Sequence, residues 1–483
     1  MSDESAAPTA GLPRLVAAGL SGESGKTLVS LALLLEAGRR NIPAQAFKKG
    51  PDYIDASWLG WASRRPARNL DTFLMGFPRA VDSFARHALP GGFNLVEGNR
   101  GLYDGVDARG THSTAELAKA LHAPIVLVLD ATKMTRTAAA LVLGCQRLDP
   151  AVPIAAVVLN QVAGARHERI LREAIQAECR VPVLGAIPRV PADVLLPSRH
   201  LGLVTPQEQP DCELLAERLR EIVGGHLDFD GLLGISRQAA PLAISSAPLA
   251  DPPNGSGLEI GFFDDSAFCF YYPENLQALR AAGAALVAIS SLTAAQLPPG
   301  LDALYIGGGF PETHAAALSA NTGLLASVRD AARRGLPIYA ECGGLMYLSR
   351  ALSWRGNRFP MAAVLPFEVD VSESPQGHGY VELLVDRPNP FFPLGAQLRG
   401  HEFHYSRIVP QAAPPATACA VVRGAGCGQA RDAAVTDNVW AAYTHLHALA
   451  TPEWAGAMIR AARAHVGRDD ILRAGCLPAQ LTG

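Results

Sequence analysis

The 483-residue chain lacks the features that mark membrane, secreted and nucleic-acid-binding proteins. It has no apolar run of the roughly 18 residues that a membrane-spanning helix needs. Its eight cysteines are scattered without a C-x-x-C pair, which argues against a zinc ribbon and against a disulfide framework. The net charge of −3 offers no basic surface for nucleic acid or an anionic membrane. We therefore expect a reduced, cytoplasmic protein that binds neither nucleic acid nor a membrane.

The composition is that of a well-packed globular protein, with 49% apolar and 18% charged residues. The chain is too long for one ordinary core, so two or more domains are expected. Around residues 229–257 the periodicity lapses into Ser, Ala, Pro, Asn and Gly, which is typical of a linker. We expect a first domain over 12–228, a second over 258–466, and a tail over 467–483.

Short apolar runs alternate with helical patterns, which predicts α/β domains with parallel sheets. Such sheets bind ligands at the carboxyl ends of their strands, where this chain places Lys48, Glu97, Asp130 and Asn160. The expected strands of the first domain are Ala44–Phe47, Phe93–Val96, Ile125–Leu129, Ile154–Leu159 and Val183–Ile187. Those of the second are Leu258–Phe263, Ala285–Ile289, Ala303–Ile306 and Pro337–Ala340.

The most informative segment is a strand-turn-helix pattern between residues 15 and 35. An apolar run leads into Gly19-Leu-Ser-Gly-Glu-Ser-Gly-Lys-Thr27, and an apolar helical pattern follows. Backbone N–H groups at such a helix start converge on one point, with the helix dipole behind them. Lys26 adds a positive charge for the β- and γ-phosphates of a nucleotide, and the Thr27 hydroxyl can join a Mg²⁺ shell.

The glycine spacing of this loop departs from the usual one. Leu20 holds the position of the first glycine, Gly19 comes one residue earlier, and Glu23 adds a carboxylate. The alternative is a simple Gly/Ser turn, but a strand, Gly-Lys-Thr and a helix in this order favour a nucleotide-phosphate site. Asn160 follows another strand, where it either contacts an adenine edge or caps the strand end. The candidate nucleotide-binding residues are Gly19, Ser21, Gly22, Glu23, Ser24, Gly25, Lys26, Thr27 and Asn160.

Charged residues in two further segments suit the same site. The Lys48–Asp55 turn carries two lysines and two acids, and it is either a phosphate and substrate turn or a solvated charged turn. Glu97 ends a buried strand, the usual place of a second Mg²⁺ anchor in phosphate-loop enzymes. The candidate metal ligands are Thr27, Asp52 and Glu97. The candidate substrate residues are Asp52, Tyr53, Asp55, Arg100 and Asp104.

In the second domain an apolar strand runs into Glu341-Cys342-Gly343-Gly344 and then into a helical pattern. Small residues there permit a strained turn that holds the sulfur out of the sheet, as in a nucleophile elbow. A helix start lowers a thiol pKa, and the Gly343 N–H can stabilise an oxyanion. The alternative is a small buried cysteine without a chemical role.

Two other segments favour the nucleophile. The glycine run with Gly308 and Gly309 follows a strand and can present backbone N–H groups to a carbonyl oxygen. His445 supplies an imidazole, although His445 and His447 together would also form half of a metal site. No third ligand at metal-like spacing stands nearby. Residues 399–406 are interpreted as a loop lining the same cavity.

Taken together, these segments resemble the cobyrinic acid a,c-diamide synthase family of glutamine amidotransferases, from about residue 13 to 463. In the first domain they are Ser24-Gly-Lys-Thr27, Gly50-Pro-Asp-Tyr-Ile-Asp55, Asn69-Leu-Asp71, Glu97-Gly98, Gly101-Leu-Tyr-Asp-Gly105 and Arg199-His-Leu-Gly-Leu203. In the second they are Gly307-Gly-Gly-Phe-Pro-Glu312, Glu341-Cys-Gly-Gly344, Gly400-His-Glu-Phe-His-Tyr-Ser406 and His445-Leu-His447.

The resemblance implies a dethiobiotin-synthetase-like P-loop ATP domain followed by a class I, flavodoxin-like glutamine amidotransferase domain. It implies a Cys342–His445 pair that frees ammonia from glutamine, because His447 replaces the acid that commonly follows the histidine. It also implies amidation of a tetrapyrrole acetate through an acyl phosphate, with ATP and Mg²⁺, in the cobalamin pathway.

Three departures from the family pattern leave the macrocycle open. They are Asn99-Arg100 in place of Val-Met, Glu23 in place of a small residue, and a second lysine at Lys48-Lys49. Relatives act on sirohaem or nickel-sirohydrochlorin, whose acetates are equivalent targets. A multi-site enzyme of the cobyric acid synthase type and a non-ligating partitioning ATPase are the alternatives, and a homodimer is possible.

Overall fold

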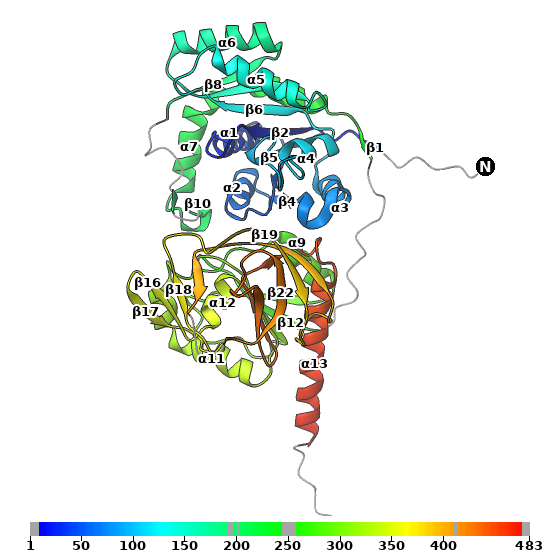
Figure 1. Cartoon of the computed structure of the whole chain (residues 1–483), viewed down its shortest axis with the longest axis vertical. Coiled ribbons are helices and arrows are strands. Elements are labelled where there is room, and N and C mark those ends of the chain that lie inside the picture. The colour runs from blue at the N-terminus through cyan, green and yellow to red at the C-terminus, as the bar shows by residue number, and fades with distance from the viewer. Residues whose placement is uncertain (1–8, 191–197, 200–201, 244–256, 410–413, 476–483) are drawn as a thin grey trace, which may run out of the picture. The chain divides into compact units, whose positions relative to one another are not determined.

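The computed structural model describes residues 9–190, 198–199, 202–243, 257–409 and 414–475. The chain divides into two compact units, residues 1–248 and 249–483, whose elements are labelled in Figure 1. Each unit has its own central sheet and its own apolar cores. The expectation of two α/β domains is confirmed. No helix in the described part of the chain is long and apolar enough to cross a bilayer.

The first unit is built on a seven-stranded sheet in the order β4-β3-β5-β2-β6-β7-β8, with every pair parallel. The strands are β2 (Arg14–Gly19), β3 (Ala44–Lys49), β4 (Arg68–Leu70), β5 (Phe93–Gly101), β6 (Ile125–Asp130), β7 (Ile154–Val162) and β8 (Val183–Pro188). The helices are α1 (Lys26–Arg39), α2 (Ile54–Ser63), α3 (Thr72–His87), α4 (Thr114–Ala120), α5 (Thr137–Leu148), α6 (Ala165–Cys179), α7 (Cys212–Ile222) and α8 (Phe229–Arg237).

Apolar side chains point to both faces of β2, which explains why both faces of this sheet are covered. Successive strand side chains point to opposite faces, so Leu15 and Ala17 enter one core while Val16 and Ala18 enter the other. The first core includes buried residues of α1, α2, α7 and α8, and the second includes residues of α4, α5 and α6 (Figure 1). Because all strands are parallel, their carboxyl ends meet at one edge, and that edge carries Lys48, Glu97 and Asn160.

The first unit extends further along the chain than the sequence indicated. Residues 229–237, expected within the linker, form α8, and Phe229, Leu232 and Leu233 are buried in the core beside β2 and β5. Arg14 of β2 donates to the carbonyl oxygen of Ala240. The short strands β1 (Thr9–Ala10) and β11 (Leu242–Ala243) pair with each other. The expected boundary at 228 is therefore too early, because the apolar face of α8 covers this sheet; residues 244–256 lie outside the described residues.

The second unit has a ten-stranded sheet in the order β13-β12-β14-β15-β24-β23-β22-β19-β20-β25. The parallel part comprises β12 (Glu259–Phe263), β13 (Ala285–Ile289), β14 (Ala303–Ile306), β15 (Ile338–Glu341) and β24 (Val439–Ala442). The antiparallel part comprises β19 (Gly377–Val385), β20 (Gln397–His404), β22 (Thr417–Arg423), β23 (Arg431–Thr436) and β25 (His445–Leu446).

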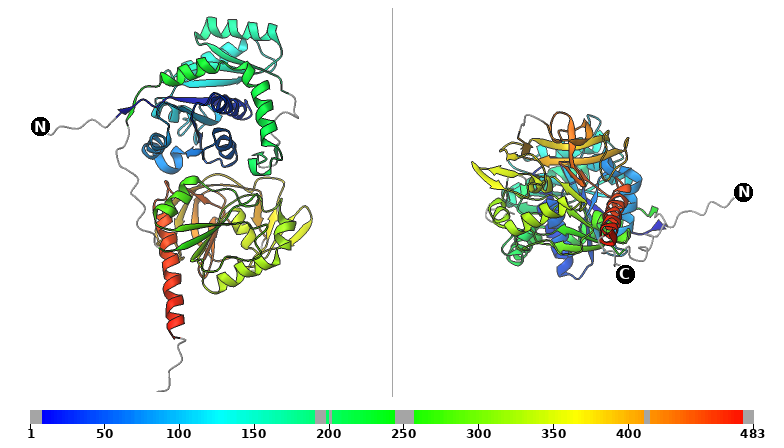
Figure 2. Two further views of the ribbon diagram at one scale, coloured as in Figure 1. Left: turned by 180° about the vertical axis from the view of Figure 1, so that it is seen from behind. Right: turned by 90° about the horizontal axis from the view of Figure 1, so that it is seen from below.

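Helices and a small second sheet complete this unit. The helices are α9 (Pro273–Ala281), α10 (Ala315–Ala320), α11 (Thr322–Arg333), α12 (Gly343–Leu348) and α13 (Glu453–Gly475). The small sheet joins β16 (Ala351–Trp354), β17 (Asn357–Pro360), β18 (Val369–Val371) and β21 (Ser406–Ile408). Figure 2 shows α13 beside α9, and the helix continues to Gly475, beyond the tail start expected at 467.

The segment interpreted as a cavity-lining loop is mostly a strand. Residues 397–404 form β20, which pairs with β19 over eight positions and with β25 at Gly400 and His401. Buried and exposed residues alternate over the first four residues of β20, as in a strand of an antiparallel sheet, and most of the later ones are buried. The loop interpretation was wrong because the Gly-His-Glu-Phe-His segment carries few of the β-branched residues that usually signal a strand.

Candidate active sites

The phosphate loop of the first unit closes tightly around its own lysine. A Cβ atom on Gly19 would lie 2.0 Å from Ser24 Oγ, and one on Gly25 would lie 2.2 Å from Asn160 Nδ2. Gly25 also has a φ of 95° at the start of α1, a conformation that favours glycine. Lys26 Nζ donates to the Ser21 carbonyl oxygen at 2.7 Å. The sequence therefore needs glycine at 19 and 25 to fold this loop.

Burial sets the charge of Lys26. Its side chain is almost fully buried, and desolvation, reinforced by repulsion from Lys48, lowers the pKa of Lys26 to about 8. The carboxylates of Glu97, Asp55 and Asp104 oppose this shift. An anionic phosphate bound in the loop would give the Lys26 ammonium an opposite charge to pair with, which favours its charged form.

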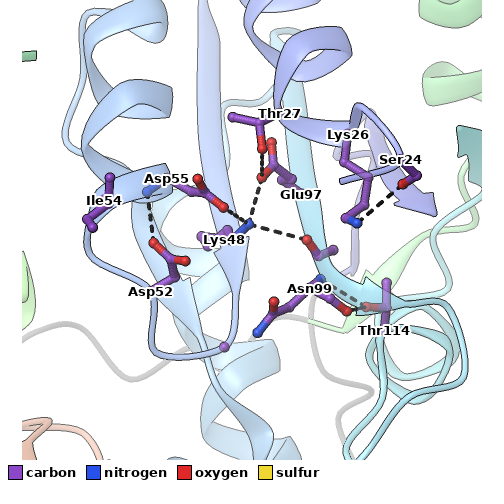
Figure 3. A network of polar contacts seen from close by, with 12 residues as sticks. Ser24, Lys26, Thr27, Lys48, Asp52, Ile54, Asp55, Glu97, Asn99 and Thr114 are labelled. Carbon is purple, nitrogen blue, oxygen red and sulfur yellow. Dashed lines mark hydrogen bonds and ion pairs between the residues drawn. The ribbon is translucent and has the colours of Figure 1, made fainter. Parts of the chain in front are cut away.

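Lys48 joins two carboxylates at the sheet edge, as Figure 3 shows. Its Nζ lies 2.6 Å from Asp55 Oδ2 and 2.6 Å from Glu97 Oε1. Burial lowers the pKa of Lys48, but the Asp55 and Glu97 carboxylates outweigh it and raise the pKa above its usual value. The sequence placed Lys48 at a strand end and in the charged turn, but it was not given a role of its own among the candidate site residues.

Glu97 and Thr27 fit a magnesium site. Thr27 Oγ1 donates to Glu97 Oε1 at 3.1 Å (Figure 3). The other carboxylate oxygen, Glu97 Oε2, is buried and has no hydrogen-bond partner among the described residues. Mg²⁺ prefers such oxygen ligands and takes only one or two carboxylates from the protein when phosphates complete its shell. Asp52 lies close enough for its charge to interact with Glu97 and Lys48, and burial together with Asp55 raises the pKa of Asp52 to about 7.

The other predicted substrate residues gather at the same edge. Asp104 accepts from the Gly101 N–H at 2.9 Å, which closes the turn after β5, and its charge acts on both Lys26 and Lys49. Burial lowers the pKa of Lys49, and the nearby Arg100 charge adds to that effect. Arg100 itself is exposed, with a φ of 50°. Substrate contact by these residues remains a prediction.

Asn160 supports the phosphate loop from the neighbouring strand β7. Its Nδ2 donates to the Ser24 carbonyl oxygen at 3.2 Å, and its Oδ1 accepts from the Gln161 N–H at 3.0 Å. The side chain is buried. These contacts give Asn160 a loop-positioning role, and the predicted adenine contact stays a prediction.

In the second unit Cys342 lies at a strained turn between β15 and α12. Its φ of 48° and ψ of −98° fall in a region that non-glycine residues rarely adopt. A Cβ atom on Gly344 would lie 2.4 Å from the Ile306 carbonyl oxygen, so the turn needs a small residue there. Burial raises the pKa of the Cys342 thiol above its usual range, Glu312 adds to the shift, and the Gly343 N–H opposes it. The resting thiol is therefore neutral and needs a base.

The glycine loop after β14 lies between the cysteine turn and His445. A Cβ atom on Gly308 would lie 2.5 Å from His445 Cε1, and one on Gly343 would lie 3.1 Å from the Gly309 nitrogen. A Cβ atom on Gly309 would lie 2.1 Å from the Ala267 carbonyl oxygen. The imidazole and the nucleophile turn thus both pack against one glycine pair. The five residues predicted for this site are brought together.

Neighbouring elements fix His445 in place. β25 pairs with β20, so that the His445 ring stacks on His401 with centroids 4.9 Å apart. Asp432 is buried and accepts from the backbone N–H groups of Tyr443 and Thr444, both at 3.1 Å. The chain entering the histidine is therefore anchored from β23.

His447 and Glu341 make buried contacts that the sequence did not predict. His447 Nε2 lies 3.6 Å from Glu274 Oε2, and its Nδ1 accepts from the Leu449 N–H at 3.1 Å. No group of three or more His, Cys, Asp or Glu side chains suited to a metal occurs in the described ranges. Glu341 Oε2 instead lies 3.5 Å from His445 Nδ1. The sequence indicated Glu341 only as part of a motif.

Comparison with known proteins assigns both units. Residues 15–204 match a family model described as the CobQ/CobB/MinD/ParA nucleotide binding domain, and residues 259–453 match the CobB/CobQ-like glutamine amidotransferase domain. The cobyrinate a,c-diamide synthase of Magnetococcus marinus is 41% identical over 93% of this chain and 97% of its own. Proteins of the same name from Archaeoglobus fulgidus and Salmonella typhimurium are 38% and 37% identical, over 91% and 93% of this chain and 95% and 98% of theirs. The chain therefore belongs to the cobyrinate a,c-diamide synthase family of glutamine-dependent amidotransferase ligases.

Proposed function

We propose that this protein converts the a and c acetate carboxylates of cobyrinate into carboxamides, using glutamine as the nitrogen donor and ATP as the activator. One observation carries the proposal: a single chain holds both a Cys342–His445 site around a glycine pair and a phosphate loop backed by Glu97 and Lys48. The first arrangement suits release of ammonia, and the second suits activation of an acid. The relatives named cobyrinate a,c-diamide synthase give the substrate class.

In the glutaminase half, His445 accepts the thiol proton of Cys342, and the thiolate attacks the side-chain amide carbon of glutamine. The amide nitrogen leaves as ammonia after it takes up that proton, and the resulting thioester is hydrolysed to glutamate. The backbone N–H groups of Gly309 and Gly343 hold the oxyanion, and one such donor is typically worth about 3 kcal/mol. The raised pKa of the buried thiol makes the base necessary.

In the ATP half, the task is to turn a carboxylate into an acyl donor. A carboxylate oxygen attacks the γ-phosphorus of ATP, ADP leaves, and the acyl phosphate then loses phosphate to ammonia. Lys26 and the N–H groups of the loop hold the phosphates in place, and Lys48 keeps Asp55 and Glu97 together at the edge. Thr27 and Glu97 would hold Mg²⁺, whose charge offsets that of the triphosphate.

A substrate panel tests this function. The protein is incubated with glutamine, ATP and Mg²⁺ and with cobyrinate, hydrogenobyrinate, sirohydrochlorin, nickel-sirohydrochlorin or sirohaem, and products are read by mass spectrometry. Each amidation replaces a hydroxyl by an amino group, so the mass decrement counts the modified side chains. We expect two amidations on cobyrinate. More than two amidations would indicate a multi-site enzyme. Turnover of sirohaem alone would show that sirohaem, not cobyrinate, is the substrate. ATP hydrolysis without amidation would contradict the proposal.

Arg100 is the residue most suited to set the choice of macrocycle. It is exposed at the edge that carries the lysines, and it is one of the departures of the sequence from the family pattern, which has Met at this position. We expect Arg100→Met to change the ratio of kcat/KM between cobyrinate and a metallated sirohydrochlorin by about tenfold, equivalent to about 1.4 kcal/mol. Arg109→Met removes an exposed arginine of the loop that follows β5 and serves as the matched control. If Arg100→Met leaves the ratio of kcat/KM unchanged, Arg100 does not contribute to substrate specificity.

A further inference from the structure

We infer that Glu341, the residue directly before the nucleophile, is the positioning carboxylate of His445. The inference rests on the glutaminase half of the proposed function and deepens it. In a Cys–His site a third group fixes which ring nitrogen carries the proton and stabilises the imidazolium that forms. In this chain the residue two positions after the histidine is His447, which has no carboxylate, and its nitrogens face Glu274 and the Leu449 N–H.

The geometry places the Glu341 carboxylate against Nδ1 of the ring and Gly308 against its Cε1 edge, with Nε2 next to it. Glu341 Oε2 lies 3.5 Å from His445 Nδ1, an ion-pair distance. A Cβ atom on Gly308 would lie 3.4 Å from His445 Nε2. A proton held on Nδ1 by the carboxylate leaves Nε2, on the side of the glycine pair, as the acceptor.

The register of two parallel strands produces this contact. Glu341 pairs with Ala442 where β15 and β24 end, and the Cys342 N–H donates to the Ala442 carbonyl oxygen at 2.7 Å. The chain then turns through Tyr443 and Thr444 to bring His445 back beside β15. The nucleophile and the positioning carboxylate are therefore adjacent in sequence.

Neighbouring donors hold the carboxylate in a fixed orientation. Glu341 is fully buried; its Oε1 accepts from the Leu446 N–H at 3.1 Å and from Tyr339 at 3.2 Å, and its Oε2 accepts from Tyr305 at 3.2 Å. Burial raises the pKa of both tyrosines well above the usual value, so their hydroxyls stay protonated and act as donors. The Leu446 contact also pins the residue next to His445. A buried carboxylate with this many donors is a rigid support rather than a mobile side chain.

The test compares Glu341→Gln with Glu341→Asp. Glutamine keeps the size but turns an N–H group or a neutral oxygen towards Nδ1, so we expect kcat for glutamine hydrolysis to fall by at least about 10²-fold with little change in KM. Alkylation of Cys342 by iodoacetamide at neutral pH should slow in the same variant, because His445 then takes up the thiol proton less readily and less thiolate forms. Aspartate restores the charge with a shorter reach, so its kcat should lie between the two. Ammonium-supported amidation should stay at the wild-type level.

Asn275→Ala is the matched control for damage to the same segment. Asn275 Nδ2 donates to the Leu446 carbonyl oxygen at 2.9 Å, and its Oδ1 accepts from the Ala448 N–H at 2.7 Å. Asn275 therefore holds the same segment as Glu341 but carries no carboxylate. We expect Asn275→Ala to keep the wild-type alkylation rate. Equal loss of activity in Asn275→Ala and Glu341→Gln, with alkylation unchanged in both, would reduce Glu341 to a structural role and overturn the inference.

Failure of the two proposals is distinguishable. A wild-type protein that hydrolyses no glutamine overturns the proposed function itself. A wild-type protein that hydrolyses glutamine, with a Glu341→Gln variant that keeps its kcat, overturns only the inference. Should Glu341→Gln not fold, as thermal melting would show, an Asp variant with wild-type melting and wild-type kcat would also contradict it, because the shorter side chain changes the contact to His445.

Discussion

Cys342→Ala is expected to abolish glutamine-dependent amidation and to leave ammonium-supported amidation intact. The alanine keeps a Cβ atom at the strained turn, so the elbow at φ 48° gains no new strain. What is lost is the sulfur that attacks glutamine, and no other described cysteine lies at a strand-to-helix turn beside the glycine pair. The loss with glutamine should reach the background of the assay, because ammonia release has no substitute nucleophile.

The measurement follows carboxamide formation by mass with either glutamine or ammonium chloride, at a pH high enough to supply free ammonia. Cys419→Ala removes another buried cysteine of the same unit and should retain glutamine use. Loss of ammonium-supported turnover in Cys342→Ala would show that the two halves do not work separately. Retained glutamine use would remove Cys342 from the mechanism.

Most strands of the parallel sheets could be predicted from the sequence because they are short, largely apolar runs; β4, which reads Arg-Asn-Leu, and β24 were not among the expected strands. Ala285–Ile289 and Ala303–Ile306 match the observed strands residue for residue, and the others differ by up to five residues. The antiparallel half of the second sheet was missed because its strands are not continuous apolar runs. In β19, for example, only every second residue is buried along most of its length, so a search for apolar runs does not detect it.

The candidate sites followed the same division. The phosphate loop, the cysteine turn and the glycine pair are local patterns, and their members lie close together in the structure. Lys48 and Glu341 have roles that arise from pairing between distant strands: β3 with β5 in one unit and β15 with β24 in the other. Such a register depends on the packing of the whole sheet. A polar residue at the end of each strand predicts that it lies at the ligand-binding edge, but it does not predict which residue of the neighbouring strand it will contact.

Lys26→Ala is expected to lose amidation from both glutamine and ammonium, in contrast to the cysteine variant. Lys26 is the buried ammonium of the phosphate loop. In the proposed mechanism its removal takes away the positive charge that stabilises the transferred phosphoryl group. A loss of roughly 10²-fold or more in kcat/KM is the size expected for one preorganised donor. Lys119→Ala, which removes an ion-paired lysine on α4, is the control. Glutamine hydrolysis alone should persist in Lys26→Ala, and unchanged amidation would contradict the phosphate-loop assignment.

The lowered pKa of Lys26 predicts a pH dependence of ATP binding, which tests the role of the lysine's charge apart from the role of its size. With a pKa lowered to about 8 by burial, the free lysine loses its proton as the pH rises through that value. A bound triphosphate stabilises the ammonium, so nucleotide binding takes up a proton above pH 8 and the affinity for ATP should fall there. Lys26→Arg keeps its charge throughout this range, so its affinity should stay level above pH 8. A wild-type affinity for ATP that does not change between pH 7 and pH 9, measured calorimetrically, would contradict direct contact between Lys26 and the phosphates.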